Sequence, residues 1–119
     1  NIMSIHSNSI YLRHILEAIA DVKNSIKKTS KSQFKENKDV KDATVRRIEV
    51  IGEAVKNISK DLKDKHPEVE WRKIAGARDI MIHAYFSVDL DVVWNMVTQS
   101  LPILKKQIQP ILKEIENKK

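Results

Sequence analysis

Apolar residues recur at helical spacing along almost the whole chain, and this periodicity restricts the fold more than any other feature. Near the N-terminus they follow the spacing i, i+3, i+4, i+7 of one face of an amphipathic helix: Leu12, Ile15, Leu16, Ile19, Val22 and Ile26. Only two glycines and three prolines interrupt the 119 residues, and no stretch alternates apolar and polar residues as a half-buried strand does. The sequence therefore predicts an all-α protein, an antiparallel bundle of four to five helices joined by short connections.

The second helix is expected to begin near Asp39 and to end before residues 63–67, because Pro67 disfavours a helical conformation in the residue before it. The polar stretch 27–39, between the first and second helices, contains a single large apolar residue, Phe34. We interpret this stretch as a loop.

The third helix is expected to start around residues 68–71, where two glutamates suit a first helical turn. Ser87 or Asp89 can then cap a fourth helix, which Pro102 and Pro110 should bend or split. The residues expected to face the core are Ala43, Arg47 through its stem, Ile48, Ile51, Ala54, Val55 and Ile58 on the second helix; Trp71, Ile74, Ala77, Arg78, Met81, Ile82 and Tyr85 on the third; and Leu90, Val93, Trp94, Val97, Leu101, Leu104, Ile108, Ile111, Leu112 and Ile115 on the fourth.

The composition excludes several classes of protein. The absence of cysteine rules out disulfides, thiolate metal sites and a cysteine nucleophile, and fits a reducing cytoplasm. No apolar run approaches the roughly 18 residues of a membrane span, and the first residues lack the basic and apolar regions of a signal peptide. We expect one cytoplasmic domain at residues 9–117, preceded by a segment, residues 1–8, that is disordered or left over from cloning.

The net charge of +6 comes from 22 lysines and arginines against 16 acids. A positive balance favours encounter with polyanions such as nucleic acid. Most of the lysines alternate with acids, as they do on an ordinary solvated helical surface. Charge alone therefore leaves both interpretations open.

The segment RDIMIHAY, residues 78–85, carries the side chains best suited to chemistry. Arg78 can bind phosphate oxygens in a bidentate way, and His83 can move protons near neutral pH. Tyr85 adds a phenol within about two helical turns of Arg78. This combination suits a reaction on a phosphodiester and needs no cofactor. The remaining histidines share no metal-ligand spacing, so no metal site is predicted.

Arg78 falls on the apolar stripe of its helix, where burying an unpaired guanidinium is expensive. One interpretation is an internal salt bridge with Glu49 or Glu53. The other is that the stripe lines a groove in which Arg78 meets a substrate phosphate. The sequence leaves these two interpretations open.

One regular helix does not gather the two candidate catalytic residues. His83 lies five residues after Arg78 and therefore roughly 140° away around an ideal helix. It shares a face with Asp79, whose carboxylate at i, i+4 could orient or charge the imidazole. A bend, a long reach by the arginine, or a second copy of the helix in a dimer is needed to bring Arg78 and His83 together.

Four segments, in order, resemble a known family. They are ATVRRIEVIGEA at 43–54, HPEVEWRKIAG at 66–76, the Arg-x4-His-x-Tyr motif at 78–85, and YFSVDL at 85–90 with Trp94 downstream. Over roughly residues 8–115 the chain resembles the HepT family of HEPN-domain toxins. The Arg-x4-His spacing alone is weak, whereas the ordered set is specific.

The resemblance implies a HEPN fold that forms a homodimer, with the motif residues of both subunits lining one cleft. It also implies a metal-independent endoribonuclease, acting on RNA as the toxin of a type VII toxin–antitoxin system. Arg78 would bind the scissile phosphate and His83 would act as general acid or base. An MntA-type nucleotidyltransferase antitoxin would transfer AMP from ATP to Tyr85 and so inhibit the nuclease.

Asp79 departs from the family pattern, in which asparagine or another polar residue often follows the motif arginine. A carboxylate there can neutralise Arg78 or favour the charged form of His83. We expect Asp79 to tune the site.

Two other hypotheses stay open at the level of sequence. A non-catalytic helical module could bind the nucleotidyltransferase and serve as its substrate or regulator, without cleaving RNA. Alternatively, a structural dimer could use Arg78 only to pair with an acid.

Overall fold

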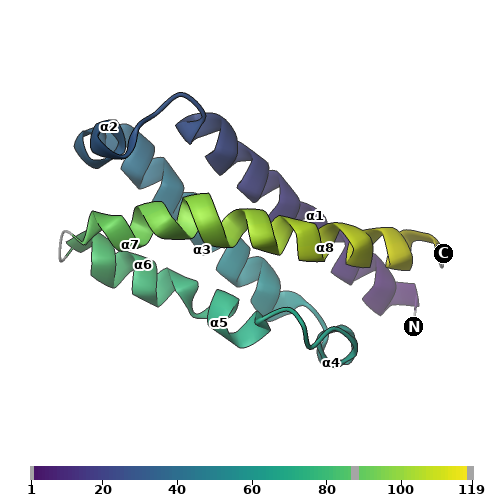
Figure 1. Ribbon diagram of the computed structural model, residues 1–119. Helices are drawn as coiled ribbons and strands as arrows, with labels where there is room; N and C mark the ends of the chain where they lie inside the picture. The colour runs from purple at the N-terminus through teal and green to yellow at the C-terminus, as the bar shows by residue number, and fades with distance from the viewer. Residues whose placement is uncertain (1, 87–88, 118–119) are drawn as a thin grey trace.

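The computed structural model describes residues 2–86 and 89–117, apart from the side chains of residues 2–5, 82, 84 and 85 (Figure 1). Within these residues it confirms the predicted all-α bundle, which measures 46 × 25 × 21 Å. The elements are α1 (Ile2–Ile26), α2 (Lys31–Glu36), α3 (Lys38–Asn57), α4 (Lys60–Lys65), α5 (Trp71–Ala75), α6 (Ala77–Phe86), α7 (Leu90–Asn95), the π-helix η1 (Met96–Ser100) and α8 (Leu101–Asn117). Among the described helices, none combines the length and apolar character that crossing a bilayer requires.

The central helix is α3, which contacts α1, α2, α5 and α6. α1 lies along α3 and also packs against α8. In Figure 1 the successive long segments α1, α3, α5 with α6, and α7 with α8 run in alternating directions, and both chain ends lie at the same end of the bundle. The antiparallel arrangement is therefore as predicted.

Most residues of the predicted apolar stripes form the core, but Arg78 of the third stripe is exposed, and the side chains of Ile82 and Tyr85 lie outside the described part of the structure. The stripe on α3 also differs from the prediction. Ala43 and Arg47 are exposed, whereas Thr44 is buried and its hydroxyl donates to the carbonyl of Val40 at 2.8 Å. The bond within the helix satisfies the hydroxyl and lets Thr44 continue the buried stripe. Among the fully buried large side chains are Leu12, Ile15, Phe34, Ile48, Ile51, Met81, Ile108 and Ile111.

The interpretation of residues 27–39 as a loop is wrong, because α2 lies within this stretch. Ser30 caps α2: its side chain accepts from the backbone N–H of Gln33, and the Gln33 side chain accepts from the N–H of Ser30. This capping box satisfies two helix-end donors. Phe34 is fully buried and packs against Trp94, with ring centroids 5.3 Å apart. Local capping and one buried ring therefore suffice for a short helix here.

The second predicted helix is shorter than expected. It ends at Asn57, and Ser59 caps a separate helix, α4, by accepting from the N–H of Leu62 at 3.3 Å. Asn8 of α1 holds this junction: it donates to the Ser59 hydroxyl at 3.0 Å and accepts from the Ser59 N–H at 2.9 Å. The segment 1–8 was expected to lie outside the domain, whereas in the structure residues 2–8 belong to α1.

The third predicted helix is divided between α5 and α6 at Gly76. Next to this break, α5 approaches α3 very closely. A Cβ on the buried Gly52 would lie 3.3 Å from the carbonyl oxygen of Ala75. The glycine thus lets the two backbones touch and fixes the position from which α6 starts.

The fourth predicted helix is split at one of the two expected places. The π-helix η1 separates α7 from α8 immediately before Pro102, whose ring nitrogen has no hydrogen to donate. Pro110 lies inside the continuous α8. Asp89 occupies the N-cap position of α7 without a side-chain capping bond, and Ser87 lies outside the described residues.

Candidate functional site

Arg78 lies in a polar hollow formed by α1, α3 and α6. The hollow has a volume of about 420 Å³, and its lining residues are Tyr11, His14, Arg46, Glu49, Val50, Glu53, Ala54, Asn57 and Arg78. The Arg78 side chain is 47% exposed, so its guanidinium remains accessible to solvent. The prediction that this arginine lines a groove agrees with its position.

Glu49 is the carboxylate at the centre of this hollow. Its Oε2 lies 3.9 Å from Nε of Arg78 and 3.7 Å from Nη1 of Arg46. At these distances both contacts are ion pairs, and neither is short enough to be a hydrogen bond. Of the two carboxylates considered as partners from the sequence, Glu49 and Glu53, it is Glu49 that pairs with Arg78, and Glu49 also pairs with Arg46. The three groups together carry a net positive charge.

Two aromatic rings form the α1 side of the hollow. Tyr11 and His14 are three residues apart on α1, and their rings meet edge to face with centroids 6.2 Å apart. His14 is exposed and Tyr11 is half-buried. The hollow thus combines arginine donors with an accessible aromatic edge.

His83 does not share this hollow. Its side chain is exposed on α6, and α6 is a regular α-helix from Ala77 to Phe86. The separation of roughly 140° from Arg78 expected for an ideal helix therefore holds. Within one chain the two predicted catalytic residues point to different surfaces.

Two other residues of the motif, Asp79 and Tyr85, also bear on the site. Asp79 is exposed, and no ion pair joins it to His83 among the described side chains, so the expected i, i+4 pairing is not formed. Tyr85 belongs to α6, and its side chain lies outside the described part of the structure. Within that part, no group of three His, Asp or Glu side chains is arranged to hold a metal ion.

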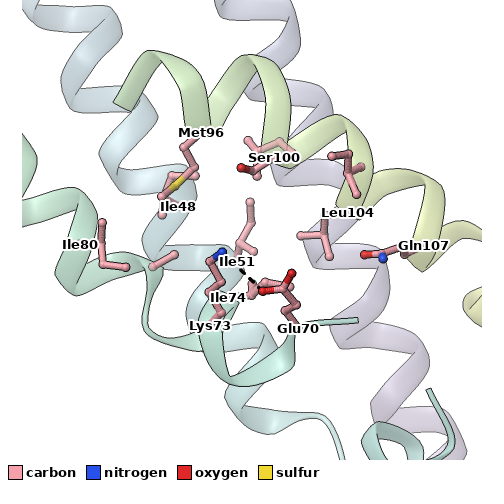
Figure 2. A pocket seen from close by; sticks show the side chains of 13 residues that line it. Ile48, Ile51, Glu70, Lys73, Ile74, Ile80, Met96, Ser100, Leu104 and Gln107 are labelled. Carbon is pink, nitrogen blue, oxygen red and sulfur yellow. Dashed lines mark ion pairs between the residues drawn. The ribbon is translucent and has the colours of Figure 1, made fainter. Parts of the chain in front are cut away.

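A second hollow, of about 180 Å³, lies between α3, α5, α6 and the segment from η1 to α8 (Figure 2). Its walls are largely apolar and include Ile48, Ile51 and Leu104. The charged residues that line it, Glu70 and Lys73, pair with each other at 3.5 Å, as the dashed line in Figure 2 marks. This hollow offers packing surface and lacks the groups that phosphate chemistry needs, so the hollow around Arg78 is the better candidate.

Sequence reasoning found part of this site. It singled out Arg78 and named Glu49 or Glu53 as a potential partner, but it did not assign Arg46 or His14 to the site. A signal was present, because the lining residues of α3 follow helical spacing: Arg46, Glu49, Val50, Glu53, Ala54 and Asn57. This spacing places them on one face of α3, but the sequence does not distinguish a face that lines a hollow from an ordinary solvated one.

The chain matches the family described as "Ribonuclease HepT-like" over residues 15–111, a range that contains both Arg78 and His83. The chain belongs to the HepT-like ribonuclease family. This match confirms the family predicted from the four ordered segments, and with it the ribonuclease class of enzyme.

Relatives of this HepT-like chain carry related names. "Putative RNase MJ1216" of Methanocaldococcus jannaschii is 44% identical over 108 residues, which are 91% of this chain and 89% of that protein. "Probable ribonuclease HepT" of Thermococcus cleftensis is 40% identical over 107 residues, 90% of this chain and 97% of that protein.

A relative with a longer chain is "Gamma-glutamylcyclotransferase and putative RNase MJ0434" of Methanocaldococcus jannaschii. It is 40% identical over 110 residues, 92% of this chain but 50% of that protein, so the HepT-like chain spans about half its length. No solved structure gives a significant match. Tyr11 and His14 precede the residues that the family match covers.

Proposed function

We propose that this HepT-like chain is a metal-independent endoribonuclease and the toxin of a type VII toxin–antitoxin system. The observation that supports the nuclease best is the accessible Arg78 beside Arg46, with only Glu49 shared between them. The shared carboxylate leaves guanidinium donors available to a phosphate group, and the second carboxylate of the hollow, Glu53, pairs with Lys56 at 3.5 Å.

The proposed chemistry uses the nucleophile that RNA itself carries. The 2′-oxygen attacks the adjacent phosphorus while His83 takes its proton, and the bond from phosphorus to the 5′-oxygen breaks. The leaving 5′-oxygen receives a proton from a protonated imidazole or from water. Arg78 offsets the charge that develops on the phosphoryl oxygens. The products are a 2′,3′-cyclic phosphate and a 5′-hydroxyl, and a 2′-deoxy substrate resists cleavage.

We further propose that the complete site spans a homodimer. Because Arg78 and His83 point in directions about 140° apart on one helix, the regular helix α6 does not turn both side chains toward one phosphate. A cleft that joins two copies of α6 solves this problem, since Arg78 of one copy can face His83 of the other. Dimerisation about a two-fold axis would create two such pairs.

Regulation through Tyr85 follows from the family resemblance. An MntA-type nucleotidyltransferase would join AMP to the phenol oxygen of Tyr85, with release of pyrophosphate from ATP. The added phosphate is negative and lies seven residues from Arg78, nearly on the same helical face. Modified Tyr85 would therefore compete with RNA phosphate for the arginine.

Incubation of the purified protein with transfer RNA and messenger RNA in excess EDTA tests the proposed activity. The parent should produce cyclic-phosphate ends, and Arg78→Ala and His83→Ala should not, although all three should melt at similar temperatures. Arg47→Ala and His6→Ala are matched controls, because they remove the same residue types outside the hollow and should cleave normally. If Arg78→Ala and His83→Ala cleave like the parent, the assignment of these residues is wrong.

A further inference from the structure

A third hollow, of about 1130 Å³, lies away from Arg78, where α3 ends and α4 and α5 follow. Its lining residues are Lys56, Ile58, Lys60, Lys63, Asp64, Pro67, Val69, Glu70, Trp71, Arg72, Lys73 and Ala75. Five cations face two carboxylates here, a net charge of +3, which is half of the +6 of the whole chain. We refer to this hollow as the basic groove.

Part of this charge is not neutralised inside the groove. Lys60 pairs with Asp64 at 2.7 Å and Lys73 pairs with Glu70 at 3.5 Å. For Lys63 and Arg72, no carboxylate lies within ion-pairing distance in the part of the chain that the structure describes. These two cations are therefore available to an external anion.

The groove presents charge to solvent and keeps its large apolar side chains covered. Ile58, Val69 and Trp71 are 3%, 2% and 7% exposed. A folded protein partner usually needs accessible apolar or aromatic anchors at the centre of its contact. A sugar–phosphate backbone needs only cations along its path. The groove therefore fits a nucleic-acid backbone better than a protein.

The linings of the basic groove and of the hollow around Arg78 include consecutive residues of α3. Lys56 lines the groove, and the next residue, Asn57, lines the hollow. Arg72 precedes Arg78 by six residues, which corresponds to about 9 Å in a continuous helix and up to roughly 20 Å in an extended chain. An RNA strand of a few nucleotides can span such a separation.

We infer that the basic groove binds the RNA backbone outside the reacting phosphodiester, with Lys63 and Arg72 as phosphate contacts. This inference rests on the proposed ribonuclease function and extends it to the part of the substrate that is not cleaved. Contacts with phosphate carry little sequence information, so the groove would strengthen binding of RNA in general.

Salt-dependent binding tests the inference without relying on cleavage. A fluorescent single-stranded RNA is titrated with His83→Ala protein, at several salt concentrations in EDTA, and fluorescence anisotropy gives the affinity. The test variant adds Lys63→Gln and Arg72→Gln. The control variant instead adds Lys27→Gln and Lys28→Gln, which remove the same charge from exposed positions outside the groove. Both variants are compared by circular dichroism and melting temperature.

Each lost phosphate contact lowers the slope of log affinity against log salt by about 0.7 for a single strand. The magnitude of the slope should therefore be about 1.4 smaller for the groove variant than for the His83→Ala protein. The control variant should have the same slope as the His83→Ala protein. Equal slopes for the two variants would overturn the inference, and so would the absence of RNA binding by the His83→Ala protein. So would tight binding of poly-glutamate that the groove variant loses, because the groove would then recognise acidic protein.

Together with the cleavage assay in EDTA, this binding experiment separates the inference from the proposed function. A parent chain that fails to cleave RNA, yet binds it with the expected dependence on Lys63 and Arg72, contradicts the nuclease and supports the groove. A chain that cleaves RNA with equal slopes for both variants supports the nuclease and contradicts the groove.

Discussion

Glu49 lies between Arg46 and Arg78, with one carboxylate oxygen 3.7 Å from the first guanidinium and 3.9 Å from the second. The carboxylate is 28% exposed, more buried than either arginine side chain. In the proposed site it would compete with an incoming phosphate for the same donors while keeping the two arginines together. In the proposed site, the donors of Arg46 and Arg78 can therefore pair either with Glu49 or with a substrate phosphate.

Replacing this carboxylate by its neutral analogue should strengthen RNA binding. Glu49→Gln in the His83→Ala background should bind single-stranded RNA several-fold more tightly at about 50 mM salt, because the hollow gains one net positive charge. The gain should shrink at about 300 mM salt, where screening is stronger. Anisotropy titrations measure both affinities.

The control for this change is Glu36→Gln, which makes the same substitution at an exposed position on α2. Glu49→Gln and Glu36→Gln should differ clearly at low salt. If the two substitutions change the affinity equally, Glu49 does not compete with RNA phosphate for Arg78, and the proposed phosphate site in this hollow is wrong.

Asn8 should contribute measurably to stability, because it bonds both the hydroxyl and the N–H of Ser59 and is itself buried. Asn8→Ala should lower the free energy of unfolding by about 1–3 kcal/mol, the cost of leaving partly buried polar groups unpaired. Urea denaturation measures the change. Asn24→Ala, at an exposed position of the same helix, should have almost no effect, and an equal loss in both variants would refute the role of the junction.

The pKa of Asp91 is lowered from 3.8 to about 2 by hydrogen bonds from Lys31 and Lys35, whose Nζ atoms lie 2.7 and 2.8 Å from its Oδ1. A carboxyl whose pKa is lower in the folded state stabilises the fold above the unfolded pKa of 3.8, and this stabilisation is lost as the pH falls through about 2. Because the pair is exposed, the effect is modest.

Asp91→Asn should therefore be less stable than the parent at pH 5, and the difference should disappear near pH 2. Melting temperatures measured across this range check the sign. A difference that stays constant with pH would show that the α2–α7 contact does not depend on this carboxylate.

Most of the architecture was predictable, because long apolar stripes at helical spacing specify both helix positions and buried faces. Short elements were harder to predict. The α2 helix depends on the Ser30–Gln33 capping box, and this local signal was outweighed by the polarity of the stretch around it. The division at Gly76 lies next to the close contact of α3 with α5 at Gly52, a tertiary feature that no local pattern reveals.

The candidate site was predictable only in part for a similar reason. Arg78 could be recognised from its motif, and Glu49 was one of the two carboxylates considered as its partner. The participation of Tyr11 and His14 could not be predicted, because it depends on how α1 crosses α3. The separation of Arg78 from His83 did follow from the sequence, since five residues on a regular helix fix it.

The central claim is that Arg78 of one subunit acts with His83 of the other, and complementation tests it most directly. Arg78→Ala and His83→Ala chains with different affinity tags are co-expressed, and mixed dimers are isolated by two successive affinity steps. Each mixed dimer contains one complete Arg78–His83 pair only if the pair spans the two subunits. The account predicts RNA cleavage in EDTA by the parent and by the mixed dimer, and none by either variant alone. A mixed dimer as inactive as the single variants, beside an active parent, would contradict it.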